Sequence, residues 1–284
     1  RELSNMTSFR VMPKHVYEGK NTVTEAEGRI TCGPYVLESF NKEAGTITFV
    51  VNEKHPRQPN VEKIVYQLFG NEDTMYLALQ QGDIDMVWAY STGVAGTYQD
   101  VLAGDANVSL INVAAANAPA VLAFNNAKGL FTNEDLRQAV SYALDYDAFK
   151  TYFGSAYAEI PNRGFVPATT VGYKDTEKLT TDASKADEYM KAAGYTEKNA
   201  DGFYVNAGGQ AAAFTLTVNA AKETHVGYAE MIKTQLEAFG IQVNLDTVDK
   251  DAYNAKTSNK FSENNITMEA AIYGYTAAGM GMGN

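Results

Sequence analysis

The hydrophobic pattern of the chain changes most clearly between residues 113 and 149. Residues 118–124 form an apolar run that ends in two asparagines, which is typical of a buried strand followed by a turn. Thr132 then has the position of a hydroxyl N-cap, with carboxylates in the first helical turn. Apolar residues recur at helical spacing from Leu136 to Leu144, which predicts an amphipathic helix. We expect this strand to cross between two lobes and this helix to open the second lobe.

The part of the chain before this crossing predicts a small sheet and a helix. Residues 35–37 and 46–51 are typical of an antiparallel pair of strands, and residues 64–69 of a further strand. Asn71 has the position of a helix N-cap, and Gly82 that of the residue that ends the helix. We therefore expect a helix between these two residues.

An order of strand, helix and strand is expected on both sides of the crossing. Before it, residues 84–88 predict the strand that completes a β-α-β unit, and residues 91–117 a Gly-, Ala- and Asn-rich connection. After it, residues 214–218 alternate as a half-exposed strand does. Residues 229–239 carry a helical stripe, and residues 241–245 alternate again. These patterns predict an α/β protein.

Composition excludes some classes of partner. The chain has 284 residues, 45% of them hydrophobic, so it can bury a sizeable core in one large or two ordinary domains. The 23 basic residues against 34 acidic residues give a net charge of -11. Because the sequence has no basic patch, we expect no nucleic-acid partner and no anionic membrane surface as a partner.

Cys32 is the single cysteine, so no internal disulfide can form, but the compartment stays open. We expect a small, packed thiol here and not a nucleophile, because no histidine is near it in the sequence. No apolar run approaches the roughly 18 residues that a transmembrane helix needs. The first residues also lack the hydrophobic region of a signal peptide.

Four stretches resemble, in the same order, the family 5 extracellular solute-binding proteins of bacterial ABC transporters, the peptide and nickel group. They are a Gly-Pro-Tyr segment at 32–37, a helix ending in Gly-Asp-Ile-Asp at 77–85, a Phe-Asn strand end followed by Asp-Leu-Arg-Gln-Ala-Val and Leu-Asp at 124–145, and a helix ending in Ala-Gly-Tyr at 185–195. No single motif is specific. Four of them in order across about two hundred residues are hard to obtain by chance.

The resemblance implies a two-lobed, periplasmic-binding-protein-like type II fold with mixed sheets. Residues 1–118 would form part of the first lobe, which is incomplete, and residues 119–284 the second lobe. The chain would then be an internal segment of a longer exported protein whose signal segment lies outside it. That protein would be periplasmic or extracellular, in the second case as a lipid-anchored lipoprotein at the cell surface.

The implied function is the capture of a small solute, foremost an oligopeptide, and its delivery to a membrane permease of an ABC transporter. Two lobes would close on the ligand about the crossing strands, so that the closed state binds more tightly. The resemblance implies no catalysis and no cofactor, and we expect a monomer.

The candidate ligand-binding residues lie in the second half of the chain. Tyr253, Tyr273 and Tyr275 each offer a flat apolar ring and a hydroxyl group to an amphipathic ligand. Asn219 and Lys222 follow a predicted strand, at the place where, by the resemblance, peptide binders hold the carboxylate end of the ligand.

The resemblance also assigns a hinge and shows one departure from the family pattern. Phe124, Asn125 and Arg137 are expected to hold the hinge strand and the following helix together. In the peptide binders, a strand ending in Gly-Trp precedes an acidic loop whose aspartate pairs with the amino terminus of the ligand. Here Tyr275 replaces the tryptophan and the loop has no acid. A ligand that is neutral or held differently at that end is therefore favoured.

Three alternatives compete with this interpretation. A metal site would need ligands at short spacing, but His15, His55 and His225 are forty residues or more apart, so we expect no metal. A peptide-sensing surface receptor on the same fold cannot be separated from a transport protein by sequence. A hydrolase would need two carboxyl groups within about 5 to 10 Å of each other in a pocket, with Asp83, Asp85, Asp145 and Asp147 as the candidates.

Overall fold

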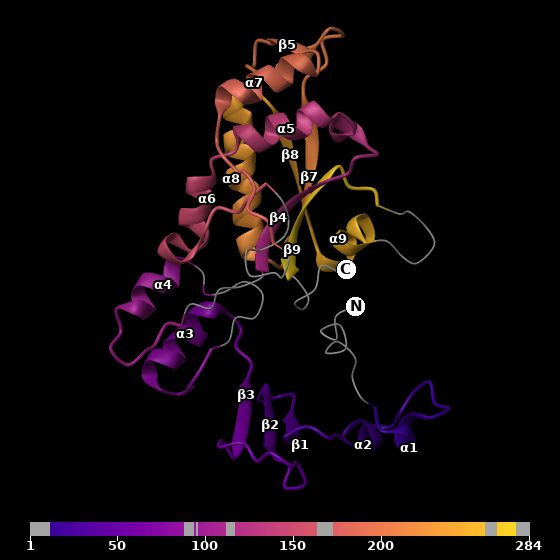
Figure 1. Ribbon diagram of the computed structural model, residues 1–284, viewed down its shortest axis with the longest axis vertical. Helices are drawn as coiled ribbons and strands as arrows, with labels where there is room; N and C mark the ends of the chain where they lie inside the picture. Colours follow the sequence, from indigo (N-terminus) through magenta and orange to yellow (C-terminus); the bar gives the residue numbers. More distant parts are fainter. Residues whose placement is uncertain are drawn as a thin grey trace. The chain divides into compact units, whose positions relative to one another are not determined.

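The computed structural model describes residues 12–87, 94, 96–111, 117–163, 173–258 and 266–276 (Figure 1). Contacts divide the chain into two compact units, Arg1–Val87 and Trp88–Asn284. The predicted lobe boundary near residue 118 lies within the second unit and stays a prediction. In the part of the chain that the structure describes, no helix is long and apolar enough to cross a membrane.

The first unit is built on a three-stranded antiparallel sheet with the strand order β1-β2-β3. Its elements, in chain order, are α1 (Lys14–Tyr17), α2 (Glu25–Gly28), β1 (Tyr35–Asn41), β2 (Thr46–Val51), β3 (Lys63–Gln67) and α3 (Glu72–Gln81). The predicted antiparallel pair and the third strand are confirmed. Helix α3 begins and ends as predicted, because the Asn71 side chain accepts a hydrogen bond from the Thr74 amide and Gly82 has a φ of 78°.

The strand predicted over residues 84–88 is wrong for the residues that the structure describes. Residues 84–87 make no strand pairing, and Trp88 lies outside the described residues. The Asp83 amide still donates to the Ala78 carbonyl of α3, so the backbone stays in the turn that ends this helix. A short apolar run forms a strand only where a neighbouring strand can pair with it, and here β3 pairs with β2 alone.

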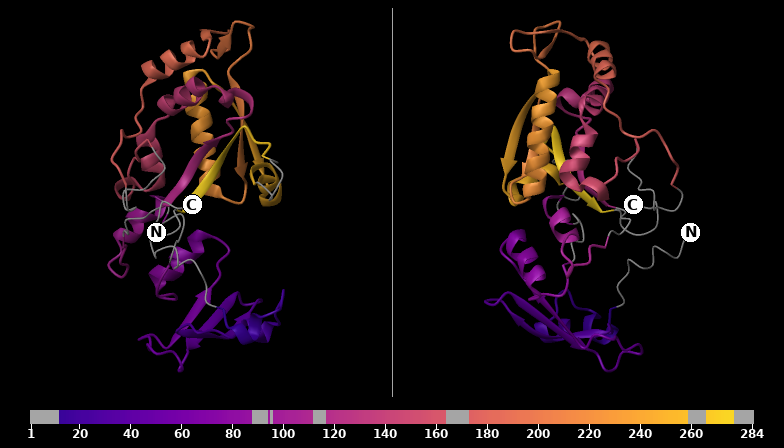
Figure 2. Two further views of the ribbon diagram at one scale, coloured as in Figure 1. Left: turned by 45° about the vertical axis from the view of Figure 1, so that its right-hand side comes forward. Right: turned by 90° about the vertical axis from the view of Figure 1, so that its left-hand side faces the viewer.

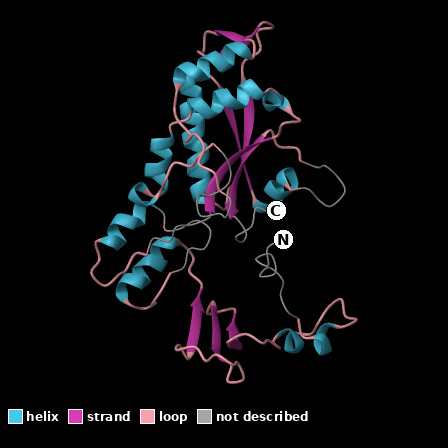
Figure 3. Ribbon diagram, viewed as in Figure 1, coloured by secondary structure: helices cyan, strands magenta, loops and turns pink. Residues whose placement is uncertain are grey.

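The second unit contains a mixed four-stranded sheet of order β4-β9-β7-β8 and a small hairpin of β5 and β6. Its elements are α4 (Gly96–Ala103), β4 (Asn117–Phe124), η2 (Gly129–Thr132), α5 (Glu134–Ala143), α6 (Tyr146–Phe153), η3 (Ser155–Tyr157), α7 (Ala183–Ala192), β5 (Tyr195–Lys198), β6 (Tyr204–Asn206), β7 (Ala213–Asn219), α8 (Glu223–Phe239), β8 (Gln242–Val248), α9 (Lys250–Thr257) and β9 (Ala270–Thr276). Strand β9 is antiparallel to β4 and parallel to β7, and β7 is parallel to β8. Figure 3 shows these strands surrounded by helices. The predicted order of strand, helix and strand over β7, α8 and β8 is confirmed.

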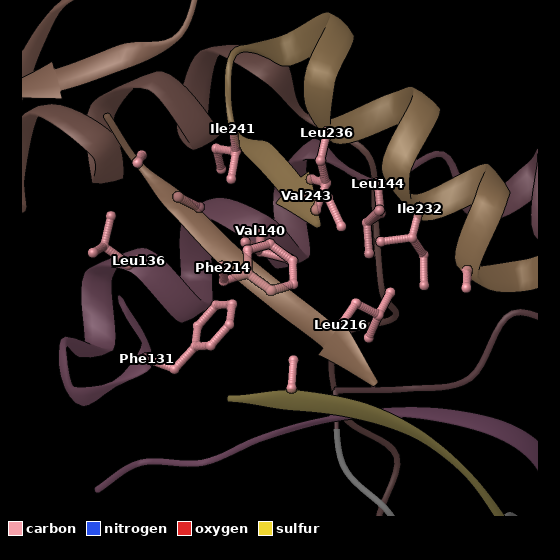
Figure 4. Packing of buried hydrophobic residues seen from close by; sticks show 14 of the residues in the cluster. Phe131, Leu136, Val140, Leu144, Phe214, Leu216, Ile232, Leu236, Ile241 and Val243 are labelled. Atoms are coloured by element: carbon pink, nitrogen blue, oxygen red, sulfur yellow. The ribbon is translucent and has the colours of Figure 1, made fainter. Parts of the chain in front are cut away.

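Helices cover both faces of this sheet, and α8 and α9 lie on opposite sides of it (Figure 2). On one face, Phe214 and Leu216 of β7 pack against Val140 of α5 and Leu236 of α8 (Figure 4). On the other face, α9 covers the strands, and Thr217 is only 1% exposed. The expectation that β7 is half-exposed is therefore wrong, because a helix and not water meets its threonine side.

Two local predictions also need correction. The connection expected over residues 91–117 contains α4, whose Leu102 is buried, although the residues on either side of this helix are partly outside the described chain. The N-cap of α5 is Asn133 and not Thr132: the Asn133 side chain accepts from the Asp135 amide, and the Thr132 hydroxyl donates to the Gly129 carbonyl. A glycine-rich composition does not exclude a helix. Where two possible cap residues are adjacent, the sequence does not show which of them caps the helix.

Candidate ligand-binding site

The face of the four-stranded sheet that α9 covers is polar near the carboxyl ends of β7 and β8. Thr217 and Asp246 are direct neighbours across these parallel strands, and the Thr217 hydroxyl donates to Asp246 Oδ2 at 3.1 Å. Lys256 of α9 donates to the same oxygen, with its Nζ 2.6 Å away. The carboxylate and the ammonium group are both partly buried, so each charge is compensated within the fold.

Two tyrosines attach α9 to β9. The Tyr253 hydroxyl donates to the Ile272 carbonyl at 2.6 Å, and the Tyr273 hydroxyl donates to the Thr257 carbonyl at 2.9 Å. The two rings meet edge to face with centroids 6.0 Å apart. Burial, with a smaller contribution from Tyr273, raises the pKa of Tyr253 to about 12. Both hydroxyls are therefore neutral donors near neutral pH, and each oxygen can still accept a hydrogen bond.

Asn219 forms the turn between β7 and α8. It is buried at the carboxyl end of β7, opposite Val248 of β8. Its side-chain oxygen accepts from the Ala221 amide at 3.0 Å, and its carbonyl accepts from the Lys222 amide at 3.0 Å. The asparagine thus fixes the backbone path that places Lys222 at the start of the helix.

Lys222 is the N-cap residue of α8, a helix of 17 residues, and its side chain makes no capping hydrogen bond. It is exposed, and it forms no ion pair with any described residue. The amino-terminal end of a long helix carries a positive partial charge. The ammonium group and this helix end therefore place positive charge beside Asn219, next to the carboxylate of Glu223 in the first turn of α8.

The structure brings most of the predicted ligand residues to one region of the second unit. Tyr253, Tyr273 and Val248 form one small cluster, and Asn219 pairs with Val248. Lys222 follows three residues after Asn219. The backbone of Tyr275 lies in β9 opposite Ala118 of β4, and its side chain is outside the described part. Contact between these residues and a ligand stays a prediction.

Three neighbouring residues were not foreseen from the sequence: Thr217, Asp246 and Lys256. Alternation in β7 and β8 would have placed Thr217 and Asp246 on the face of Asn219, but the register between the strands is a tertiary property. The position of Lys256 depends on where α9 packs. No pattern in the sequence indicates that position.

The predicted hinge residues form a compact group within the second unit. The Asn125 side chain donates to the Met268 carbonyl at 3.0 Å, and its amide donates to the Glu269 carbonyl at 2.8 Å. The Phe124 ring stacks on Phe131 at 4.2 Å between centroids, and Arg137 Nη1 donates to the Phe131 carbonyl at 2.7 Å. These contacts attach the end of β4 to the start of β9 and η2 to α5. Bending of the chain at these residues stays a prediction.

The carboxylates of the hydrolase alternative are exposed, two in each unit: Asp83, Asp85, Asp145 and Asp147. Asp145 has a structural role, since its side chain accepts from the Ala148 amide and caps α6. Asp147 lies in the first turn of the same helix.

The candidate metal ligands and the cysteine lie in different settings. His225 is buried in α8, while His15 is exposed in α1. Within the described ranges, no three His, Cys, Asp or Glu side chains are grouped as a metal site would require. The prediction of a packed thiol is wrong, because Cys32 is exposed in the loop that precedes β1.

A known protein family matches this chain. The chain matches the bacterial extracellular solute-binding proteins, family 5 Middle, over residues 3–278, which is nearly its whole length. It belongs to this family. The predicted resemblance is thereby confirmed, and this family 5 chain has the predicted type II periplasmic-binding-protein fold. Of its two larger described sheets, the four-stranded one is mixed and the three-stranded one is antiparallel.

Individual relatives of this family 5 chain are distant. A probable ABC transporter-binding protein of Deinococcus radiodurans is 27% identical over 158 residues, which cover 53% of this chain and 25% of the relative. The oligopeptide-binding protein AppA from Bacillus subtilis, solved in complex with a nonapeptide, has a TM-score of 0.69 at 20% identity and covers 94% of this chain. NikZ from Campylobacter jejuni, solved in complex with Ni(L-His), has a TM-score of 0.70 at 19% identity and also covers 94%.

The chain spans about half the length of these solved structures, 52% of AppA and 51% of NikZ. At such identities the structures establish the shared fold. The nonapeptide and Ni(L-His) are the ligands of those two proteins.

Proposed function

We propose that this family 5 chain is part of a protein that captures an oligopeptide outside the cytoplasmic membrane and delivers it to the permease of an ABC transporter. Family membership over residues 3–278 supports the class of solute-binding protein. The peptide-bound AppA structure, which shares the fold, supports a peptide as the ligand. Capture would proceed by closure of two lobes, because contacts on both sides stabilise the closed state.

The observation that carries the choice of ligand is the exposed ammonium group of Lys222, which forms no ion pair with any described residue. A second ammonium group near this edge of the sheet, that of Lys256, is already paired with Asp246. Lys222 instead adds its charge to the amino-terminal end of α8. A terminal carboxylate of a peptide has the charge and the acceptor geometry that this arrangement favours.

Tyr253 and Tyr273 would contribute surface and not charge. Their hydroxyls donate to backbone carbonyls, so their remaining capacity is that of acceptors and ring faces. A peptide backbone offers amide donors to such acceptors, and its side chains pack on aromatic rings. The pair would therefore hold the body of the ligand while Lys222 holds its carboxyl end.

The test measures two affinities by calorimetry on the full-length protein: that for a peptide with a free carboxyl terminus, and that for the same peptide with a carboxyl-terminal amide. Lys222→Gln should weaken binding of the free-acid peptide about tenfold, or roughly 1.4 kcal/mol, and leave the amidated peptide unchanged. Lys250→Gln is the matched control, since Lys250 is also exposed at the start of a helix. Equal affinity of the Lys222→Gln variant for both peptides, at the level of the unsubstituted protein, would reject the assignment.

The same capture step would serve a peptide-sensing surface receptor. The two roles differ in what happens after binding, so uptake of a labelled peptide in cells with and without the neighbouring permease separates them. Uptake that needs both the protein and the permease supports transport. Unchanged uptake without the protein supports sensing.

A further inference from the structure

The loop that follows α4 contains an asparagine in the sequence pattern of a glycan acceptor. Asn107 is followed by Val108 and Ser109. An asparagine, any residue except proline, and then a serine or threonine form the acceptor pattern for N-linked glycans. The same pattern begins at Asn5 and at Asn265, which lie outside the described residues. Because so short a pattern also arises by chance, its structural setting decides whether it can be used.

Both side chains that the acceptor pattern needs are accessible. Asn107 and Ser109 are exposed, and Val108 between them is partly buried. Neither the Asn107 carboxamide nor the Ser109 hydroxyl forms a hydrogen bond with any described residue. An acceptor has to offer its carboxamide nitrogen to an enzyme, and the hydroxyl two residues later has to bind the same enzyme. Here no internal hydrogen bond of these two groups has to be broken first.

The backbone at the acceptor is held by one residue, Asp105. Its side chain accepts from the Asn107 amide at 2.9 Å, and its carbonyl accepts from the Val108 amide at 3.1 Å. The Asp105 amide in turn donates to the carbonyl of Leu102, which is buried in α4. The chain from Ser109 to Ile111 is neither helix nor strand. Asn107 therefore lies on a turn that is attached to a packed helix and that continues into an irregular segment.

Two large apolar side chains lie exposed on either side of this turn. Val101 is 58% exposed and Ile111 is 77% exposed, the highest value for a large apolar side chain in the described part of the chain. Single exposed apolar residues are normal on a soluble protein. A bulky, hydrated glycan between these two would keep this surface soluble.

We propose that Asn107 is a site of N-glycosylation, with an oligosaccharide linked through a diphosphate to a membrane lipid as the donor. In the transfer, the Asn107 carboxamide nitrogen forms a bond to the anomeric carbon of the first sugar. The bond between that carbon and the diphosphate oxygen breaks, and the lipid diphosphate leaves with the electron pair. The carboxamide gives one proton to a base of the transferring enzyme.

The proposal goes beyond solute capture and does not depend on the ligand. It requires that the protein reaches the outer side of the cytoplasmic membrane, and the family to which this chain belongs is extracellular. The candidate ligand residues begin at Asn219, and the acceptor pattern contains none of them. Loss of the glycan and loss of solute binding are therefore separate outcomes.

Mass spectrometry of proteolytic peptides tests the proposal on the full-length protein isolated from its native host. The peptide that contains Asn107 should carry the additional mass of an oligosaccharide. Asn107→Gln and Ser109→Ala should each lose this mass completely. Ser109→Thr should keep it, because the hydroxyl group is retained. Since both positions are exposed, we expect these variants to fold like the unsubstituted protein.

Asn60 is the matched control within the chain. It is exposed and is followed by a valine, as Asn107 is, but Glu62 stands where the acceptor has Ser109. Asn60 should therefore carry no sugar in any of the samples. An oligosaccharide on Asn60 as often as on Asn107 would show that the acceptor pattern does not direct the modification.

Two further results would overturn the proposal. One is an Asn107 peptide without additional mass in the protein from its native host. The other is a Ser109→Ala variant that keeps the oligosaccharide, because the hydroxyl would then have no role in the transfer.

Discussion

The two sheets of this chain have similar strand patterns and opposite degrees of burial. In the four-stranded sheet, Phe214 and Thr217 of β7 are each 1% exposed although they point to opposite faces. In the three-stranded sheet, no residue is buried on either face. Of the helices that cover β7, α8 follows it directly and α9 follows β8, whereas α5 precedes it in the chain. Alternation therefore shows that a strand has two faces, and not what covers each of them.

The sharpest test of this contrast removes a phenyl ring from each sheet. Phe214→Ala should lower the free energy of unfolding of the 284-residue chain by about 3 to 5 kcal/mol, because it leaves a cavity between β7, α5 and α8. Phe49→Ala should cost less than about 3 kcal/mol, because Phe49 is only partly buried. Urea unfolding measures both. Equal losses would show that Phe49 is as well buried as Phe214.

A second test concerns the link between β9 and β7. A Cβ at Gly129 would lie 2.2 Å from Glu269 Oε1, and the φ of 60° at Gly129 is unfavourable for other residues. Glu269 would have to move, and it would lose its 2.7 Å hydrogen bond from the Thr215 amide. Gly129→Ala should therefore cost about 2 to 3 kcal/mol.

Gly209→Ala is its control. Gly209 has a similar φ of 76°, but its Cβ would meet no atom within 4 Å. Only the backbone cost of about 1 kcal/mol should remain. A loss at Gly129 no greater than that at Gly209 would mean that the Glu269 contact is unimportant.

Some features of both units could be predicted because their causes are local. Asn71 and Gly82 bound α3 as expected, and the strands of both sheets follow their alternation. Residues 84–87 form no strand because pairing partners are not encoded locally. Thr217 was expected to face solvent, because the alternation of threonines with apolar residues in β7 is the same whether the threonines contact water or α9.

The candidate site shows the same division. Lys222 could be proposed from the family resemblance, but the ion pair of Asp246 with Lys256 depends on register and helix packing. The structural roles of the Tyr253 and Tyr273 hydroxyls were likewise hidden, because their acceptors are backbone carbonyls of other elements. Sequence indicates which side chains are suited to a ligand. It does not show which of these side chains already form hydrogen bonds or ion pairs within the fold.

A smaller effect is expected from removing one hydroxyl in each unit. Tyr253→Phe should lower the stability by about 1 kcal/mol without any ligand, because the Ile272 carbonyl loses its donor. Tyr66→Phe is the control on the exposed sheet and should change stability by less than about 0.5 kcal/mol. Thermal unfolding in ligand-free buffer measures the difference. An unaffected Tyr253→Phe variant would remove the structural role of this hydroxyl.

The smallest effect is a dependence on alkaline pH. The pKa of Tyr253 is raised to about 12, above the value of about 10 for an unfolded tyrosine. The folded chain therefore holds this proton more tightly, so its contribution is complete below pH 10 and is lost as pH rises towards 12. The urea midpoint should fall over this range, and less steeply in Tyr253→Phe. Parallel curves for the two proteins would contradict the assignment.

The ladder between β9 and β7 is short, with only Leu216 opposite Ala270 and Thr217 opposite Ala271. One residue further along β9, the carbonyl of Ile272 receives its hydrogen from a phenol on α9 instead of from a strand. A side chain thus takes over where main-chain pairing stops. Helix α9 in this way extends the hydrogen bonding of the sheet. A displacement of α9 would first affect β9, the strand that lies between β4 and β7.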